Sequence, residues 1–375
     1  MDQADERGQE LERLLAQGVE TGVFPGAIAS VGQLAGSKAP RIHRWAGLLE
    51  PGGEPVKADT PYDLASLTKP VVSMAGLRLS QRGVVDLHVP IARWLPSIAG
   101  SAGGDATLAE LLCHRAGLSA WGQLYEECRF VFGSDAMKAC MLHEASQRRA
   151  EEVPEGSRPP AIYSDLGYLL AGEALASAAD CELSDLVERE VTGPLGLAGE
   201  IYYAASLPSR VRAQLVARVA PTEFDPWRGR LLRGEVHDEN CAAFGGVAGH
   251  AGLFGTSRAV LELGLCVLDV LAGRSDWIDG RLLAWALSPR PGGSHVVGWD
   301  TKSEEGSSAG GRFSRRSFGH LGFTGTSIWC DPARELCAVL LCNRVHPSRD
   351  NAAIRQFRPA FHDAVVDLWY RHPNA

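Results

Sequence analysis

The sequence of 375 residues lacks any apolar run that approaches the roughly 20 residues needed to cross a bilayer. It also lacks an excess of positive charge, because 37 Lys and Arg stand against 45 Asp and Glu, giving a net charge of −8. Surfaces that bind nucleic acid are usually basic, so we expect neither a nucleic-acid partner nor a membrane partner. The first residues, MDQADER, lack the basic start and apolar core of a signal peptide, and we therefore expect a cytoplasmic protein.

Paired cysteine motifs are absent as well. The nine cysteines are scattered without a C-x-x-C, which predicts free, mostly buried thiols in a reducing compartment. Residues 237–240 read HDEN and resemble metal ligands, but no spaced partner motif accompanies them. We expect a solvated loop there, and no metal or cofactor. The hydrophobic content of 45% is ordinary for a soluble protein that buries a large core in one or two lobes.

Lysine is scarce, with five among the 37 basic residues, and one of the five has a serine three places before it. This pair is Ser66 and Lys69, in residues 62–70, which read YDLASLTKP. At the start of a helix, this spacing puts the hydroxyl and the amine on one face. A buried lysine with a lowered pKa can take the serine proton and make the hydroxyl nucleophilic. The alternatives are a serine that caps a helix and a lysine on the surface.

The apolar pattern predicts strands near both ends of the chain and helices between them. Strands are expected at 27–32, 41–47, 295–299, 317–323, 326–331 and 336–342. Helices are expected at 6–18 with Gly18 as the C-cap, then at 66–81, 108–114, 135–147, 166–179, 183–191, 259–272 and 352–370. Residues 36–38 are expected to form a turn and the Gly- and Ser-rich residues 301–316 a mobile loop. Strands at both ends favour one mixed sheet with a helical insertion.

Two further motifs follow the serine–lysine pair. Residues 163–165 read YSD and residues 319–326 read GHLGFTGT, with supporting runs LLCHRAGL at 111–118 and GGVAGHAGLF at 245–254. The order S-x-x-K, Y-x-(N/D), (K/H)-x-G resembles the serine β-lactamase and penicillin-binding-protein superfamily. It is most similar to the class C and esterase branch, in which a tyrosine opens the second motif. The resemblance extends over about residues 20–345.

The resemblance implies an α/β (α+β) fold: an antiparallel sheet flanked by helices, with an inserted all-helical lobe. We expect residues 1–375 to form a single catalytic domain, with a sheet lobe at about 1–83 and 250–375 and a helical lobe at about 84–249. The cleft between the lobes would hold the site.

The resemblance also implies the role of each site residue. Ser66 attacks a carbonyl, Tyr163 and Lys69 take or relay its proton, and the amides of Ser66 and Phe323 form the oxyanion hole. A half-buried structural aromatic is the alternative for Tyr163. The histidines of the supporting runs, His114 and His250, are more typical of hydrogen-bonded structural residues than of catalytic bases.

Three departures from the family pattern bear on the substrate. Asp165 stands where asparagine is usual, His320 where β-lactamases carry lysine, and Leu321 where they carry a hydroxyl residue. Asp165, Leu321, Gly322 and Phe323 are the expected substrate-binding residues, and His320 joins the catalytic set. A neutral imidazole offers no permanent cation to a substrate carboxylate, which points away from penicillins and D-alanyl peptides.

We therefore expect a serine hydrolase that acts on a carboxylic ester or amide through a Ser66 acyl-enzyme, most simply an esterase. Its substrate would be a small-molecule or short-peptide acyl compound. Acyl transfer, or D-alanyl peptidase or β-lactamase activity, would use the same residues and stays an alternative. A non-catalytic binding protein on the same fold is another. The G-x-S-x-G around Ser308 lies in the expected loop and is interpreted as a chance match.

Overall fold

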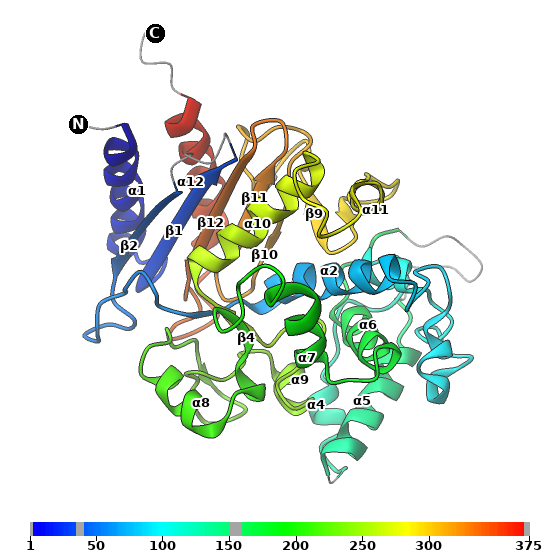
Figure 1. Cartoon of the computed structure of the whole chain (residues 1–375). Coiled ribbons are helices and arrows are strands. Elements are labelled where there is room, and N and C mark those ends of the chain that lie inside the picture. Colours follow the sequence, from blue (N-terminus) through cyan, green and yellow to red (C-terminus); the bar gives the residue numbers. More distant parts are fainter. Residues whose placement is uncertain (1–2, 35–40, 132, 151–159, 371–375) are drawn as a thin grey trace.

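The computed structural model describes residues 3–34, 41–131, 133–150 and 160–370. Within these ranges the main sheet has seven antiparallel strands in the order β2-β1-β12-β11-β10-β9-β8 (Figure 1). The strands are β1 Gly26–Gln33, β2 Arg41–Gly47, β8 His295–Val296, β9 Trp299–Thr301, β10 Phe318–Leu321, β11 Ser327–Asp331 and β12 Leu336–Cys342. The sheet therefore joins strands from the two ends of the chain, as predicted.

Helices cover both faces of this sheet. Helices α1 (Gln3–Glu20) and α12 (Ile354–Tyr370) lie on one face and α10 (Ser257–Leu271) on the other (Figure 1). Successive residues of β12 point to opposite sides, so that Leu340 packs with α1 and α12 while Val339 packs with α10. This alternation gives the sheet two cores and confirms the predicted antiparallel sheet flanked by helices.

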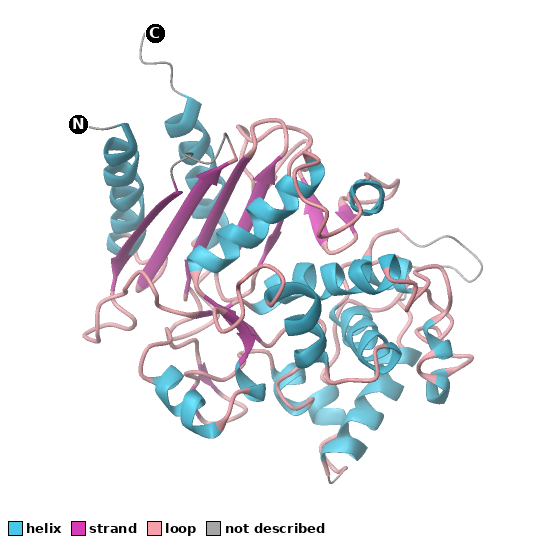
Figure 2. Ribbon diagram, in the orientation of Figure 1, coloured by secondary structure: helices cyan, strands magenta, loops and turns pink. Residues whose placement is uncertain are grey.

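The other helices gather beside the sheet (Figure 2). They are α2 Thr68–Gln81, α3 Leu108–Leu112, α4 Leu124–Glu127, α5 Ser134–Gln147, α6 Asp165–Ala178, α7 Leu183–Val187, α8 Ser209–Val216, α9 Glu239–Ala243 and α11 Gly280–Ala286. This region also carries the short strands β4 Ile201–Tyr203, β5 Phe224–Asp225 and β6 Arg230–Leu231. Strand β4 pairs with β7 (Leu253–Gly255), which pairs with β3 (Tyr62–Asp63) directly before the predicted nucleophile.

Some predicted boundaries were wrong. Helix α1 continues past Gly18 to Glu20. The single strand expected at 295–299 is a hairpin of β8 and β9, which turns at Gly298 with φ 78°. A side chain there would also meet Ser73 of α2, so the turn favours glycine. The expected turn at 36–38 lies outside the described residues. Residues 306–310 form turns without the strand and helix of a nucleophile elbow, in keeping with the chance match at Ser308.

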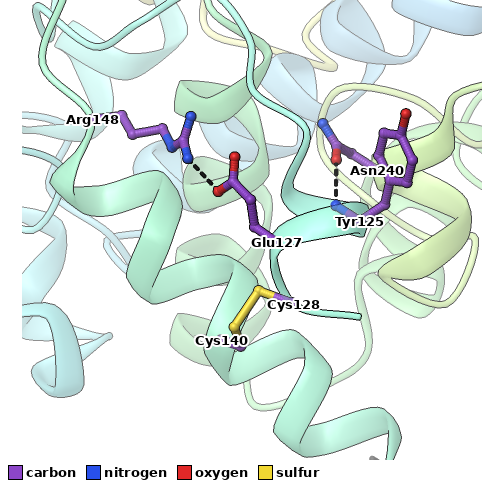
Figure 3. Close-up of a disulfide and its surroundings, with 6 residues drawn as sticks. All are labelled: Tyr125, Glu127, Cys128, Cys140, Arg148 and Asn240. Atoms are coloured by element: carbon purple, nitrogen blue, oxygen red, sulfur yellow. Dashed lines mark hydrogen bonds and ion pairs between the residues drawn. A yellow bond between two sulfur atoms is a disulfide. The ribbon is translucent and has the colours of Figure 1, made fainter. Parts of the chain in front are cut away.

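The prediction that all cysteines are free is wrong for Cys128 and Cys140, which form a disulfide (Figure 3). The chain folds back between α4 and α5 and brings the two Cα atoms within 6.0 Å of each other. The spacing of cysteines along the sequence does not reveal this approach. The other seven cysteines are free. The expectation of a reducing compartment rested on free thiols and loses that support.

Candidate active site

The predicted nucleophile, Ser66, lies in the turn Ala65–Leu67 directly before α2. Lys69, in the first turn of α2, is fully buried, and its Nζ donates a hydrogen bond to Ser66 Oγ at 2.8 Å. Ala65 has a left-handed φ of 49°, and the carboxylate of Asp63 accepts its N–H at 2.8 Å. This contact stabilises a conformation that a non-glycine residue rarely adopts. The predicted hydroxyl–amine pair is therefore present in the structure.

The charge of Lys69 is set by an acidic neighbour. Nζ lies 2.6 Å from Asp165 Oδ1 and donates to the carbonyl of His250 at 3.3 Å. Burial alone would lower the pKa of the amine, but the Asp165 carboxylate and the Tyr163 phenol outweigh burial, and the pKa of Lys69 is raised. The expectation of a lowered lysine pKa was therefore wrong, because a carboxylate shares the buried site.

Tyr163 lies just before α6 and faces the same amine. Lys69 Nζ is 4.7 Å from the centre of the tyrosine ring. Burial raises the pKa of the Tyr163 phenol, and the Lys69 amine opposes that rise. Ser164 fixes the entry into α6, since its hydroxyl accepts the N–H of Gly167 at 3.1 Å and donates to the carbonyl of Ser119 at 2.7 Å.

Two histidine rings pack against Tyr163 from other elements. The ring of His114 lies 4.5 Å from it and that of His295 lies 5.4 Å from it, centre to centre. His114 Nδ1 accepts the N–H of Ser164 at 2.9 Å, which agrees with the structural role expected for this residue. Burial lowers the pKa of both imidazoles. Sequence reasoning missed His295, because a lone histidine in a short strand carries no motif.

His320 lies on β10 with its ring centre 6.0 Å from that of Tyr163. Burial, and then the charge of Lys69, lower the pKa of His320 to about 3. The imidazole is therefore neutral at pH 7, and its Nδ1–H donates to the carbonyl of Leu321 at 2.9 Å. This agrees with the interpretation of the third motif as lacking a permanent cation.

The turn between β10 and β11 brings Gly322 and Phe323 to the nucleophile. Thr326 donates its hydroxyl to the carbonyl of Leu64 at 3.1 Å, and a Cβ on Gly322 would lie 2.7 Å from that carbonyl oxygen. Arg358, buried on α12, donates to the carbonyls of Gly322 and Thr326 at 2.7 and 2.9 Å. The backbone that carries the predicted oxyanion donor Phe323 is therefore held against the segment that carries Ser66.

A cavity of about 700 Å³ opens over these groups. Ser66, Tyr163, Asp165, His320 and Phe323 all line it, so the structure brings the predicted site residues together. Lys69 lies beneath the cavity wall rather than in it. Leu321 and Gly322 complete the predicted set along the same wall, and Trp121 adds an apolar side chain from the loop before α4.

Cations in this cavity were not foreseen from the sequence. Four arginines line it: Arg344, Arg349, Arg355 and Arg358. Arg344 donates to the carbonyl of Phe323 at 2.9 Å, and Arg349 pairs with Glu223 and Glu239. Arg355 is exposed, and its side chain makes no hydrogen bond or ion pair with the described residues. The third motif therefore supplies no permanent cation, but the cavity as a whole does.

The segment 237–240 is not the solvated loop that was expected. His237 and Glu239 are buried, and Asp238 begins α9 by accepting the N–H of Cys241 at 2.7 Å. His250, expected to be structural, pairs its Nε2 with Asp238 at 2.9 Å. No group of three or more metal-ligating side chains occurs in the described part of the chain. Asp238 and Glu239 thus stabilise this wall of the cavity through their contacts with His250 and Arg349.

This wall continues to the disulfide. Asn240 of α9 accepts the N–H of Tyr125 at 3.1 Å and donates to the carbonyl of Gly122 at 2.8 Å. Figure 3 shows Tyr125 on the short helix α4, which Cys128 follows directly. The disulfide therefore tethers the helix that follows the pocket-lining residue Trp121. Over the same described ranges, no helix is long and apolar enough to span a membrane.

The comparisons with known proteins agree with this geometry. The β-lactamase family model matches residues 11–360, and the chain therefore belongs to the β-lactamase family, a family of serine hydrolases. It is 28% identical to a candidate D-alanyl-D-alanine carboxypeptidase of Escherichia coli (strain K12), over 91% of this chain and 83% of that protein.

Two solved structures show the same fold. The class C β-lactamase of Rhodobacter sphaeroides has a TM-score of 0.66 and 19% identity, over 94% of this chain and 98% of that one. EstCE1, a hydrolase with promiscuous acyltransferase activity, has a TM-score of 0.66 and 17% identity, over 97% of this chain and 98% of that one. The predicted fold class and family are confirmed.

Proposed function

We propose that this serine hydrolase cleaves small neutral carboxylic esters through an acyl-enzyme on Ser66. The observation that carries the proposal is the 2.8 Å hydrogen bond from buried Lys69 to Ser66 Oγ, at the base of a cavity of about 700 Å³. A serine in contact with a proton-transfer partner, open to a substrate-sized cavity, is the arrangement that nucleophilic catalysis requires.

In this mechanism the Lys69–Tyr163 pair first loses one proton to solvent; Ser66 Oγ then adds to the ester carbonyl, and its proton passes to this pair. The amides of Ser66 and Phe323 donate to the oxyanion. The carbon–oxygen bond to the alcohol then breaks, the alcohol takes the proton, and the acyl group stays on Ser66. Water then adds to the acyl-enzyme and gives a proton to the same pair. The carbon–oxygen bond to Ser66 breaks, Ser66 Oγ takes that proton back, and the acid leaves. An alcohol in place of water would give acyl transfer, which product analysis with added alcohol detects.

Two features support a neutral ester. His320, with a pKa of about 3, supplies no positive charge beside the nucleophile. Trp121 and Phe323 are 41% and 50% exposed and give the cavity apolar surface. The test compares kcat/KM for a neutral short-chain ester, a cephalosporin and a D-alanyl-D-alanine peptide. We expect the ester to be turned over fastest, and a preference for either of the other two would contradict the proposal.

D-alanyl carboxypeptidase activity is the second candidate. Arg355, exposed at the cavity and without a partner among the described residues, is the observation that favours it, since a guanidinium can pair with a peptide carboxylate. The name of the Escherichia coli relative points the same way. If this candidate is right, Arg355→Gln abolishes cleavage of the peptide and leaves cleavage of the neutral ester intact. Arg210→Gln, an exposed arginine of α8 away from the cavity, is the matched control.

A further inference from the structure

An ion pair lies directly beneath the predicted nucleophile. Asp165 Oδ1 is 2.6 Å from Lys69 Nζ; the lysine side chain is fully buried, and that of the aspartate is 21% exposed at the cavity. Asp165 is also the first residue of α6, and its N–H donates to the carbonyl of Ala120 at 2.8 Å. The carboxylate is thus held in place by its backbone and directed at the amine.

The contact has a chemical consequence. An amine that takes the proton of Ser66 must first be unprotonated, whereas a carboxylate at 2.6 Å favours the ammonium form. In a buried site this attraction is screened much less than at the surface. Asp165 therefore opposes the free-base form of Lys69, and the amide of an asparagine would not.

We propose that Asp165 is a positioning residue that keeps Lys69 charged and so sets the pH at which Ser66 becomes nucleophilic. This inference rests on the proposed function of Ser66 as the nucleophile. The side chain of Asp165 also lines the cavity, so its expected contact with the substrate stays a prediction beside this one.

Among the residues that the structure describes, Asp165 is the carboxylate that acts on Lys69, and the other neighbours are of different chemistry. Tyr163 lies before α6, and the ring of Tyr168, within α6, is centred 5.6 Å from Nζ. His250 contributes its carbonyl, while its imidazole pairs with Asp238. Three histidines from different parts of the fold lie near Lys69, and the pKa of each imidazole is lowered. They are His114 after α3, His295 on β8 and His320 on β10. Asp300 lies 3.8 Å from His295 and faces that ring.

Both candidate proton acceptors respond to Asp165 in the same direction. Its charge opposes the lowering of the Lys69 pKa by burial, and it adds to the rise that burial causes in the pKa of Tyr163. Removing the charge therefore lowers both values. Whichever group accepts the proton of Ser66, the reaction then starts at lower pH.

The test uses Asp165→Asn, which keeps the size of the side chain and removes its charge. A fluorophosphonate probe reports the first step alone: the oxygen–phosphorus bond to Ser66 forms, the phosphorus–fluorine bond breaks, and the serine proton leaves through the acceptor. The labelling rate is measured from pH 5 to 10. We expect the midpoint of its rise with pH to move down by about one to three units.

Asp185→Asn is the matched control, because Asp185 is an exposed aspartate in the first turn of α7, outside the cavity. Its midpoint should equal that of the wild type. If Asp165 only stabilises the start of α6, Asp165→Asn lowers the rate equally at all pH values and leaves the midpoint in place. That result overturns the proposal.

A second measurement does not depend on activity. The chain has five lysines, so ¹³C labelling at lysine Cε gives few resonances, and Lys69→Arg identifies that of Lys69. We expect Lys69 to titrate at lower pH in Asp165→Asn than in the wild type. If the probe labels Ser66 but this titration does not change, the inference about Asp165 fails alone. If the titration shifts but the probe does not label Ser66, the proposed function fails and the ion pair stands.

Discussion

The hydroxyl of Thr326 donates to the carbonyl of Leu64 at 3.1 Å and joins the β10–β11 turn to the segment that carries Ser66. Between them there is no room for a side chain on Gly322, since a Cβ would lie 2.7 Å from the Leu64 oxygen. Thr324 makes a second such bond, to the carbonyl of Asp63 at 2.8 Å, so the turn that carries the predicted oxyanion donor Phe323 is held against the segment that carries the nucleophile.

Gly322→Ala should accordingly separate these two groups. We expect kcat/KM for an ester to fall by roughly tenfold to a hundredfold, because small displacements of reacting groups are costly. Gly280→Ala, at the start of α11, is the control, since its Cβ would lie 3.6 Å from the nearest atom and fits without strain. Equal activity of the two variants would show that the close contact does not position the site.

The mechanism predicts that Lys69 and Tyr163 act as one unit. Both surround the Ser66 hydroxyl, and removing either interrupts the same proton transfer. Lys69→Met, Tyr163→Phe and the double variant should therefore be similarly inactive in kcat/KM. Effects of the two single changes that multiply in the double variant would contradict a shared role. Circular dichroism of each variant checks that it remains folded.

The neutral His320 should make the protein sensitive to acid. Its pKa is about 3 in the folded state, against an ordinary value of 6.5, so below pH 6.5 the unfolded chain binds a proton that the folded chain does not. The contribution of His320 to the free energy of unfolding is therefore fully present above pH 6.5 and is lost as the pH falls toward 3. At pH 5 the free energy of unfolding should be lower by about 2 kcal/mol for this reason.

His320→Gln removes this titration. The free energy of unfolding, measured by urea denaturation at pH 7 and pH 5, should therefore fall less for the variant than for the wild type. His143→Gln, an exposed histidine of α5, is the control and should retain the wild-type difference. An unchanged difference in His320→Gln would show that His320 is not held neutral.

The disulfide between Cys128 and Cys140 predicts the number of reactive thiols and a change in the free energy of unfolding when it is removed. Protein purified without reductant and unfolded should react with an alkylating reagent at seven thiols, because Cys128 and Cys140 are paired. Cys128→Ser should lower the free energy of unfolding by about 2–3 kcal/mol, since it opens a short loop in the unfolded chain. Cys266→Ser, a free half-buried cysteine, controls for the loss of a thiol. Nine reactive thiols before reduction would contradict the pairing.

Local patterns in the sequence are sufficient to predict part of this structure. The contact between Ser66 and Lys69 follows from their spacing at the start of a helix, and the strands of the sheet follow from apolar runs bounded by turns. That His320 is not a permanent cation follows from the ordinary pKa of an imidazole, although the fold lowers this pKa further. These features depend on residues that are close together in the chain.

Other features depend on contacts between distant segments, and these were missed. The charge of Lys69 depends on Asp165, which only the fold brings within 2.6 Å. Arg355 enters the cavity from the C-terminal helix, where nothing in its local sequence marks it. The burial of residues 237–240 and the pairing of Cys128 with Cys140 likewise follow from chain packing rather than from composition.

The most direct test of the account is the site of covalent labelling. The protein is treated with a fluorophosphonate probe, the intact mass is measured, and the modified residue is mapped by peptide sequencing. We expect one adduct per chain, on Ser66. Ser66→Ala should abolish this adduct together with ester hydrolysis, and Ser308→Ala should leave both unchanged. An adduct on Ser308, or labelling that survives in Ser66→Ala, would contradict Ser66 as the nucleophile.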